Sequence, residues 1–372
     1  MLTGMPVTVV GAGIAGLAAA LALAQRGARV VVLEQAAEIA EVGAGLQISP
    51  NGAAVLSALG LGAMARAASI PSKAVQLRDY RLGARVLRLD LARYHTGPHP
   101  FLLIHRAGLI GLLERAACEA GVDIRLGQSA HPTRLEGGLI LGADGVRSAT
   151  RAMLNDPGDA MFTGQVAWRA VIKDAAPPEA QVWMGPGRHL VTYPLPGGMR
   201  NIVAVEERSD WAAEGWNHRD DPANLRAAFQ GFAPEVRDWL DRVEKVNLWG
   251  LFRHPVAPVW HDGRHVILGD AAHPTLPFLA QGANLALEDA WVLADCLSHF
   301  PQPEALALYQ SRRRDRSIRA IAAANRNARN YHLRNPVIRT FAHTALRIGG
   351  RLAPQAPLKA FNWLYDHDVT KP

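Results

Sequence analysis

The sequence predicts an α/β fold in which a doubly wound domain is interleaved with a β-sheet domain and followed by C-terminal helices. Residues 7–34 have the pattern of a strand, a glycine-rich turn, an alanine-rich helix and a second strand. Residues 164–206 are rich in Trp, Tyr and Val, as β-strands are, and they interrupt the α/β pattern. Arginine-rich helical segments finish the chain.

Length and composition are those of a soluble enzyme. The 372 residues are enough for two domains, and 49% apolar with 20% charged residues argues against disorder. Cys118 and Cys296 are the only cysteines, which excludes a disulfide framework or a zinc cluster and suits a cytoplasmic location. The uncharged stretch 7–24 is nearly long enough to cross a membrane, but its glycines fall where a tight turn needs them, so we expect no membrane segment.

Positive charge is concentrated near the C-terminus. The formal net charge is +7, and residues 311–351 contain eleven arginines but one acidic residue, Asp315. Such a region either binds nucleic acid, forms a solvated helical face, or attracts anionic cofactors and substrates. No nucleic-acid-binding motif accompanies it, so we expect no nucleic-acid partner.

The first glycine-rich turn predicts a dinucleotide site. "GAGIAG" (11–16) follows a strand and opens a helix, and Glu34 ends the next strand, as in a Rossmann-like unit. Glycines there let the backbone approach a pyrophosphate at the helix N-terminus, and Glu34 can accept hydrogen bonds from a ribose. The alternative is a glycine-rich turn without a ligand. The motif does not distinguish NAD from FAD.

Further strand, turn and helix signals are spread along the chain. Near its end, "ILGDAAHPTLPFLAQGANLALEDA" (267–290) predicts a strand that stops at Gly269–Asp270 and a helix that begins near Gly282. The other segments are a glycine-rich loop entering a helix (42–56), a β-hairpin (74–91), a strand end and amphipathic helix with Arg106 near its start (102–121), a buried strand broken at Asp144–Gly145 (139–151) and a helix near 222–244.

Together these motifs resemble one enzyme family. "GAGIAG", "LE" (33–34), "HR" (105–106), "GADGVRS" (142–148) and the "GD…GANLALEDA" stretch are similar to motifs of the class A FAD-dependent aromatic hydroxylases, single-component flavoprotein monooxygenases that include salicylate, 3-hydroxybenzoate and 6-hydroxynicotinate hydroxylases. The resemblance spans roughly residues 6–335, in the family's order. The segment between the strand at 122–126 and "GADG" is shorter than the family's usual β-hairpin.

The resemblance implies a Rossmann-like FAD-binding domain interleaved with a β-sheet substrate domain, plus C-terminal helices. The implied FAD-binding domain is discontinuous and comprises residues 1–73, 98–160 and 258–300. Residues 74–97 and 161–257 form the implied substrate domain, and 301–372 the C-terminal helical segment.

FAD is the tightly bound cofactor that the resemblance implies, and no metal ligand is predicted. Asp270 would accept hydrogen bonds from the ribityl chain, and the helix starting at Gly282 would point its N-terminus at the flavin N1–C2 edge. Pro274 and Pro277 would stiffen a loop beside the ring, and Leu285 is expected to be core. The predicted cofactor-binding residues are Gly11, Gly13, Ala15, Gly16, Glu34, Gln35, Gln47, Arg106, Asp144, Asp270, Pro277, Gly282, Ala283 and Asn284.

The implied reaction is aromatic hydroxylation. NAD(P)H would reduce FAD, O2 would add at flavin C4a, and the resulting hydroperoxide would transfer oxygen to a small phenolic or heteroaromatic acid. The sequence has no second GxGxxG motif, so NADH or NADPH is expected to bind transiently. The protein is expected to be a monomer or a homodimer. A urate-type or other heterocycle hydroxylase, a flavoprotein oxidoreductase without oxygen insertion, and a flavin-bearing binding protein remain as alternatives.

Two residues are predicted to act on the substrate. A phenol reacts best as its phenolate, which calls for a base near neutral pH. His189 and Tyr193 match a His-x-x-x-Tyr spacing that resembles the hydroxybenzoate hydroxylases, with His189 as base and Tyr193 as wall or hydrogen-bond partner. In a straight strand they stand roughly 13 Å apart, so both touch one ring only if the strand bends before Pro194. The alternative is a satisfied strand histidine and a core tyrosine.

Other candidates are weaker. His273 lies in the "GD" stretch, and its position suggests that it structures the loop. Arg169 or Arg188 would pair with a substrate carboxylate, or else be solvated arginines at a strand edge.

Overall fold

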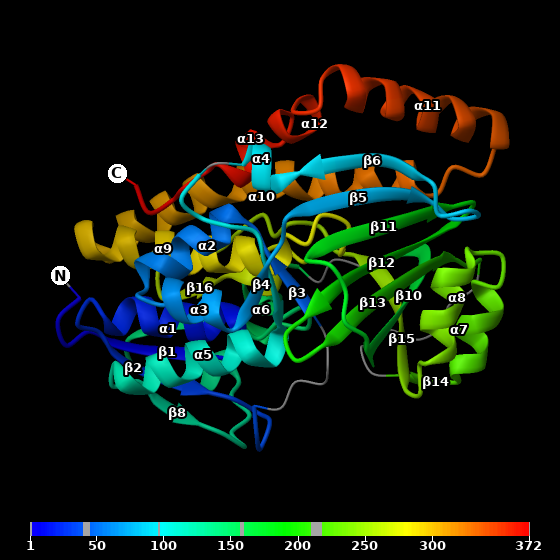
Figure 1. Ribbon diagram of the computed structural model, residues 1–372. Coiled ribbons are helices and arrows are strands. Elements are labelled where there is room, and N and C mark those ends of the chain that lie inside the picture. Colours follow the sequence, from blue (N-terminus) through cyan, green and yellow to red (C-terminus); the bar gives the residue numbers. More distant parts are fainter. Residues whose placement is uncertain (1, 40–44, 96, 157–159, 210–217, 372) are drawn as a thin grey trace.

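A computed structural model describes residues 2–39, 45–95, 97–156, 160–209 and 218–371 (Figure 1). Two sheets lie side by side, with the long helix α10 (Gln302–Tyr331) crossing both. A five-stranded parallel sheet forms the centre of the Rossmann-like domain. Its strands, in spatial order, are β16 (His265–Ile267), β9 (Leu139–Gly142), β1 (Pro6–Val10), β2 (Arg29–Leu33) and β8 (Asp123–Arg125).

The uncharged stretch 7–24 forms β1 and helix α1 (Ile14–Ala24), which is buried along most of its length. It packs against α5 (Arg106–Glu119) and α9 (Gly282–His299). Burial on all sides explains why this stretch carries no charge. Among the described helices, none combines the length and the apolar character that a membrane crossing requires.

A small sheet joins the two domains and corrects one prediction. Residues 42–56 were expected to be a loop entering a helix, but Gly45–Ile48 form strand β3, which pairs with β7 (Leu102–His105). β7 also pairs with β4 (Ser69–Pro71). Helix α2 (Pro50–Ala58) follows β3 and begins with a proline, which suits a first helical position. Residues 42–44 lie outside the described residues.

The second domain is built on an eight-stranded sheet. The predicted hairpin 74–91 is confirmed as β5 (Ala74–Asp79) and β6 (Arg85–Asp90). β5 pairs in parallel with β11, so this early segment completes a sheet formed mainly by residues 161–253. The other strands, in spatial order, are β14 (His218–Asp220), β15 (Val246–Arg253), β10 (Met161–Lys173), β13 (Met199–Glu207), β12 (Arg188–Leu195) and β11 (Glu179–Gly185).

Two short helices cover one face of this sheet. The single helix expected near 222–244 is instead α7 (Pro222–Ala228) and α8 (Pro234–Asp241). Pro234 has no amide hydrogen to continue a helix, and here it begins the second one. Trp168, Leu190 and Ile202 of the sheet pack against these helices in one apolar cluster. The opposite face is therefore left to form a site.

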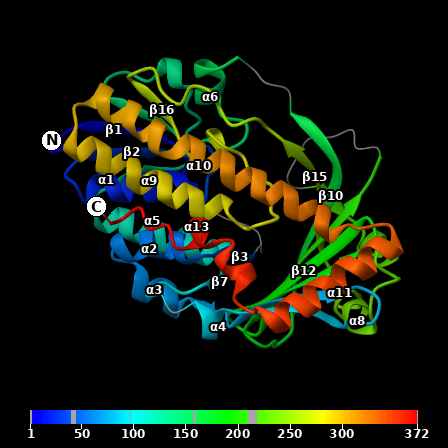
Figure 2. The same cartoon turned by 90° about the horizontal axis from the view of Figure 1, so that it is seen from above.

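The predicted C-terminal helical segment, residues 301–372, begins with a helix that packs on both domains. Ala305, Leu306 and Tyr309 at the start of α10 belong to the core of the Rossmann-like domain. Near its other end, Ala324 packs with Trp249 of the large sheet. A 30-residue helix is about 45 Å long, which lets α10 span both domains. Seen from above, α10 runs from one half of the molecule to the other (Figure 2). α11 (Pro336–Leu352) then lies above β6 in the view of Figure 1. The remaining helices are α3 (Gly62–Ala67), α4 (Leu91–Tyr94), α6 (Ala149–Leu154), α12 (Ala356–Lys359) and α13 (Asn362–Tyr365).

A buried ion cluster fastens α10 to α9. The Arg313 guanidinium is fully buried and bonds to both Glu288 and Asp289, with Nε 2.7 Å from Asp289 Oδ1. Arg316 adds a hydrogen bond of 2.8 Å to Glu288. Burial alone would raise the pKa of Asp289, but His273 and Arg313 outweigh it and lower that pKa to about 2. Two arginines of the basic C-terminal region are thus neutralised inside the protein rather than presented to solvent.

We expect Arg313→Ala to lower the free energy of unfolding by about 3–5 kcal/mol, because it leaves two buried carboxylates without their main counter-ion. Arg312 is the matched control. It is half exposed and lies 3.6 Å from Asp295, so Arg312→Ala is expected to cost less than about 1 kcal/mol. Urea unfolding followed by circular dichroism measures both. Equal losses would show that the cluster does not stabilise the fold.

Candidate active site

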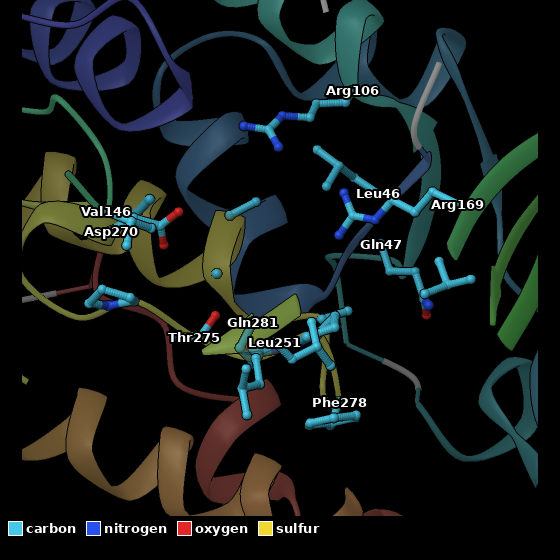
Figure 3. A pocket seen from close by; sticks show the side chains of 18 of the residues that line it. Leu46, Gln47, Arg106, Val146, Arg169, Leu251, Asp270, Thr275, Phe278 and Gln281 are labelled. Carbon is cyan, nitrogen blue, oxygen red and sulfur yellow. The ribbon is translucent and has the colours of Figure 1, made fainter. Parts of the chain in front are cut away.

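A cavity lies where the Rossmann-like domain meets the large sheet (Figure 3). Arg106, Arg169 and Asp270 point into it from three different elements. The Rossmann side contributes mainly turns and helix starts, and the sheet contributes one face of its central strands. The predicted residues that line it are Gly13, Ala15, Gln47, Arg106, His189, Tyr193, Asp270, Pro277, Gly282 and Ala283.

The glycines of "GAGIAG" have different functions. A Cβ atom on Gly11 would lie 2.5 Å from the Ala143 carbonyl oxygen, and one on Gly16 would lie 2.0 Å from the Gly11 oxygen. These two glycines therefore allow the turn to pack, and neither lines the cavity. A Cβ atom on Gly13 would meet nothing within 4 Å. Gly13 caps the N-terminus of α1 and leaves open space where an anionic ligand meets the free N–H groups of the helix.

Glu34 closes the same turn. Its carboxylate accepts hydrogen bonds from the Ala12 N–H (2.8 Å) and the Ala36 N–H (2.9 Å) at the end of β2. Glu34 and the exposed Gln35 lie beyond the cavity, and their contact with a ribose stays a prediction.

Asp144 offers an unused acceptor. Its Oδ2 accepts a hydrogen bond from the Ala149 N–H, which explains why the chain turns here into α6. Its Oδ1 is buried and has no hydrogen-bond partner among the described residues. Because a buried polar atom is normally paired, this oxygen fits a ligand hydroxyl close to Ala143 and Gly145, which line the cavity.

Asp270 lies in the cavity after a turn with left-handed backbone. Gly269 has φ +60°, and a Cβ atom there would lie 2.8 Å from the Ala15 side chain, so the position favours glycine. The Asp270 carboxylate accepts no hydrogen bond from the described residues, and burial raises its pKa although His273 and Arg106 oppose the shift. A hydroxyl-rich ligand would supply the missing donors.

The start of α9 faces the same cavity. Ala280 has φ 52°, and among the described residues it alone combines a side chain with positive φ. The turn presents Gly282 and Ala283 to the cavity. Asn284 does not line the cavity, and its contact with the cofactor stays a prediction. Fully buried behind the helix start, its side chain instead accepts from the Ser49 N–H (2.9 Å) and donates to the Gln47 carbonyl (3.1 Å).

His189 is buried in β12 at the cavity wall. Its Nδ1 lies 2.5 Å from Nε2 of His332, and its ring packs near Phe278 and Tyr331 with centroids 5.7 and 5.3 Å away. Burial, with a smaller effect of His332, lowers the pKa of His189 well below its usual value of 6.5. The ring is therefore neutral at pH 7 and retains one nitrogen that can accept a proton.

Tyr193 lines a different part of the cavity. β12 pairs with β13 in unbroken register from Arg188 to Leu195, so no bulge interrupts the strand before Pro194. At about 3.3 Å per residue, His189 and Tyr193 stand about 13 Å apart along the strand and do not face one small ring together. Tyr193 packs with Leu103 and Leu195, and burial raises its pKa, so the phenol stays neutral.

The two candidate arginines lie on opposite faces of the large sheet. Arg169 of β10 lines the cavity, with its guanidinium 4.3 Å from the centre of the Trp249 ring. Arg188 precedes cavity-lining His189 and therefore faces away, where it bonds to Glu206 at 3.0 Å and to the Ala228 carbonyl. Of the two, Arg169 is placed to meet a substrate.

Several cavity residues escaped the sequence analysis. The apolar wall consists of Val203, Val205, Trp249, Leu251 and Phe278. The signal of the four strand residues is their alternation between two faces, which does not say which face is a site, and Phe278 lies in the loop before α9. His332 carried no motif at all. His273 was expected to structure its loop, and it bonds to Asp289 of the buried ion cluster.

Comparisons with known proteins agree with this geometry. A family model described as "FAD binding domain" matches residues 4–138 and 126–324. The 3-hydroxybenzoate 6-hydroxylase of Polaromonas naphthalenivorans (strain CJ2) is 35% identical over 394 residues, covering 98% of this chain and 96% of the relative. The 3-amino-4-hydroxybenzoate 2-monooxygenase of Streptomyces cremeus is 36% identical over 349 residues, covering 88% of each chain.

Solved structures share the fold. Klebsiella pneumoniae HpxO complexed with FAD and uric acid aligns with a TM-score of 0.81 at 26% identity, covering 94% of both chains. A salicylate hydroxylase substrate complex aligns with a TM-score of 0.81 at 22% identity, covering 99% of this chain and 97% of the other. The chain therefore belongs to the FAD binding domain family, and within it to the FAD-dependent aromatic hydroxylases.

Proposed function

We propose that this enzyme uses NADH or NADPH and O2 to hydroxylate a small phenolic or heteroaromatic acid. One observation carries the proposal: a single cavity is lined by many of the predicted FAD-binding residues, by Arg169 and by a buried, neutral His189. The named relatives that act on hydroxybenzoates support the same class of substrate. We further propose that the enzyme is located in the cytoplasm and acts as a monomer or homodimer.

The residues present fit FAD. Gly13 and the N-terminus of α1 would take its pyrophosphate, Asp270 and Asp144 would accept hydrogen bonds from its hydroxyls, and the first turn of α9 would meet the flavin ring. Bound there, FAD supplies the activation of O2, which protein side chains cannot.

The sheet side fits the substrate. Trp249, Val205 and Phe278 provide an apolar wall for a ring, and Arg169 can pair with a carboxylate. His189 would accept the phenolic proton. A urate-type reaction is the second candidate, because HpxO was solved with uric acid, but the relatives named for hydroxybenzoates are more similar to this chain, at 35% and 36% against 26% identity.

Turnover with a substrate panel tests the proposal. The panel comprises 3-hydroxybenzoate, salicylate, 3-amino-4-hydroxybenzoate, 6-hydroxynicotinate, their methyl esters and uric acid, with NAD(P)H oxidation and product followed together. We expect one acid to give product in step with NAD(P)H oxidation, and its ester to fail. Arg169→Met should lower kcat/KM for the acid about 10- to 100-fold, the effect of losing a charged hydrogen bond worth about 1.5–3 kcal/mol.

Each alternative gives a different result in this assay. Stimulated oxidation of NAD(P)H without product would identify an oxidoreductase that inserts no oxygen. Activity with uric acid alone would favour the heterocycle hydroxylase. Flavin binding without any turnover would indicate a flavin-bearing binding protein.

Asp270→Ala is expected to weaken FAD binding about 10- to 100-fold, because a buried carboxylate acceptor is lost. The apoprotein should unfold at the same temperature or higher, since the raised pKa of Asp270 shows that folding disfavours its charge. Flavin fluorescence titration and thermal unfolding measure the two effects. A variant that binds FAD as tightly as the parent would remove Asp270 from the cofactor site.

His189→Ala is expected to keep FAD but to lose product by about a hundredfold or more, with NAD(P)H oxidation diverted to hydrogen peroxide. Tyr193→Phe is the control, because it keeps the cavity wall at the other end of β12. Product and peroxide are measured in the same assay. An unchanged product yield and pH profile in the His189 variant would exclude it as the base.

A further inference from the structure

A chain of polar side chains leads from His189 to the protein surface. His189 Nδ1 lies 2.5 Å from His332 Nε2, and His332 Nδ1 lies 2.8 Å from Glu207 Oε1. Arg334 bonds to the other oxygen of Glu207 at 2.5 Å. Exposure rises in the same order: His189 and His332 are buried, the Glu207 side chain is 28% exposed and that of Arg334 is 71% exposed.

The backbone holds this chain in place. His332 follows the end of α10, and its carbonyl accepts a hydrogen bond from the Gly187 N–H in the turn before β12. The Gly187 carbonyl accepts in turn from the Glu207 N–H at 2.9 Å. These backbone bonds hold His332 and Glu207 on either side of Gly187, in addition to the hydrogen bonds that the His332 ring makes.

The hydrogen-bond pattern defines where each proton sits. The Glu207 carboxylate is acceptor-only, so His332 carries its proton on Nδ1 and donates it to Glu207. His332 Nε2 is then an acceptor, and His189 donates to it from Nδ1. This leaves His189 Nε2 as an acceptor, and it makes no hydrogen bond with any described residue.

One competing arrangement exists. Gln165 Nε2 lies 3.4 Å from His332 Nδ1, and a bond from that amide would put the His332 proton on Nε2. The shorter distance and the negative charge of Glu207 favour the first arrangement. The charged groups around His332 are Glu207, Arg334 and Arg188.

We propose that His332 and Glu207 form a proton relay that carries the phenolic proton from His189 to solvent. The relay rests on the proposed function, in which His189 takes this proton. His189 touches the substrate, whereas His332 and Glu207 are positioning residues that act through it.

The steps balance without another reactant. His189 Nε2 accepts the proton of the phenol, which becomes a phenolate. The Nδ1 proton of His189 passes to His332 Nε2, and the Nδ1 proton of His332 passes to Glu207 or to water beside it. The reverse sequence returns one proton to the hydroxyl oxygen of the product and restores both rings.

Burial explains why a relay is needed. It lowers the pKa of His189, and it also lowers that of His332 although Glu207 opposes the shift. A ring in this environment holds an added proton poorly, so His189 is an effective acceptor only if the proton moves on.

Histidine tautomers in the holoenzyme provide the first test. Two-bond 15N–1H spectra of 15N-histidine-labelled protein should show His189 and His332 both neutral at pH 7 and both protonated at Nδ1. Glu207→Gln should remove the fixed Nδ1 tautomer of His332. Signals are assigned by their loss in His332→Gln and His189→Gln. This measurement does not need turnover.

Proton release provides the second test. The holoenzyme is mixed with 3-hydroxybenzoate, or with benzoate as the ligand without a phenol, in a weakly buffered indicator solution. Wild type should release a proton with 3-hydroxybenzoate and none with benzoate. His332→Gln and Glu207→Gln should slow this release about a hundredfold while changing benzoate affinity less than about twofold.

His343→Gln is the matched control. Like His332, His343 is a buried histidine in the C-terminal part of the sequence beside a carboxylate, with Nδ1 3.5 Å from Asp79 Oδ2, but it is not part of the hydrogen-bonded series from His189 to Arg334. The His343→Gln variant should release the proton at the wild-type rate.

The outcomes separate the relay from the function. A His332 ring protonated on Nε2, or release at the wild-type rate in His332→Gln, would overturn the relay even if the enzyme hydroxylates phenols. The expected tautomers in a protein that turns over no aromatic acid would support the proton chain and reject the proposed substrate.

Discussion

The position of the Gly269–Asp270 turn depends on the buried pair Glu288–Asp289 and its counter-ion Arg313. None of these side chains is appreciably exposed, and a buried charge without its partner is strongly unfavourable. All their contacts must therefore form together. Asp289 also holds the Gly269 N–H and His273, and Glu288 accepts from Asn51 at 2.6 Å. The turn before Asp270, helix α2 and helix α10 are fixed by one set of charges.

This arrangement makes α10 a connection between the two halves of the site. The first half of α10 is held to α9 by Arg313, and the helix ends at Tyr331, against His189 in the large sheet. The group that would take a proton from the substrate and the turn that would hold the cofactor are therefore positioned by the same helix. Neither depends on a flexible linker between domains.

Much of the Rossmann-like half could be predicted because its signals are local. "GAGIAG", the Gly269–Asp270 turn and the helix start at Gly282 each depend on glycine at a particular backbone position. Each motif is encoded by residues that are close together in the sequence. The sequence did not reveal that Arg313 pairs with Glu288 and Asp289, or that His189 meets His332, 143 positions away. Such pairs form only when distant elements pack. The regular register of β12, which separates His189 from Tyr193, likewise depends on its neighbours.

In the large sheet, successive side chains point to opposite faces, so the residues that stabilise the fold are separate from those that select the substrate. Leu190, Ile202 and Leu248 face α7 and α8 in the apolar core, whereas the residues next to them in sequence, among them Val191, Val203 and Trp249, face the cavity. Every second position can therefore change to suit a different ring without disturbing the packing on the other side. The sheet is a surface on which new aromatic specificities can evolve while its folding core and its cofactor loops stay the same.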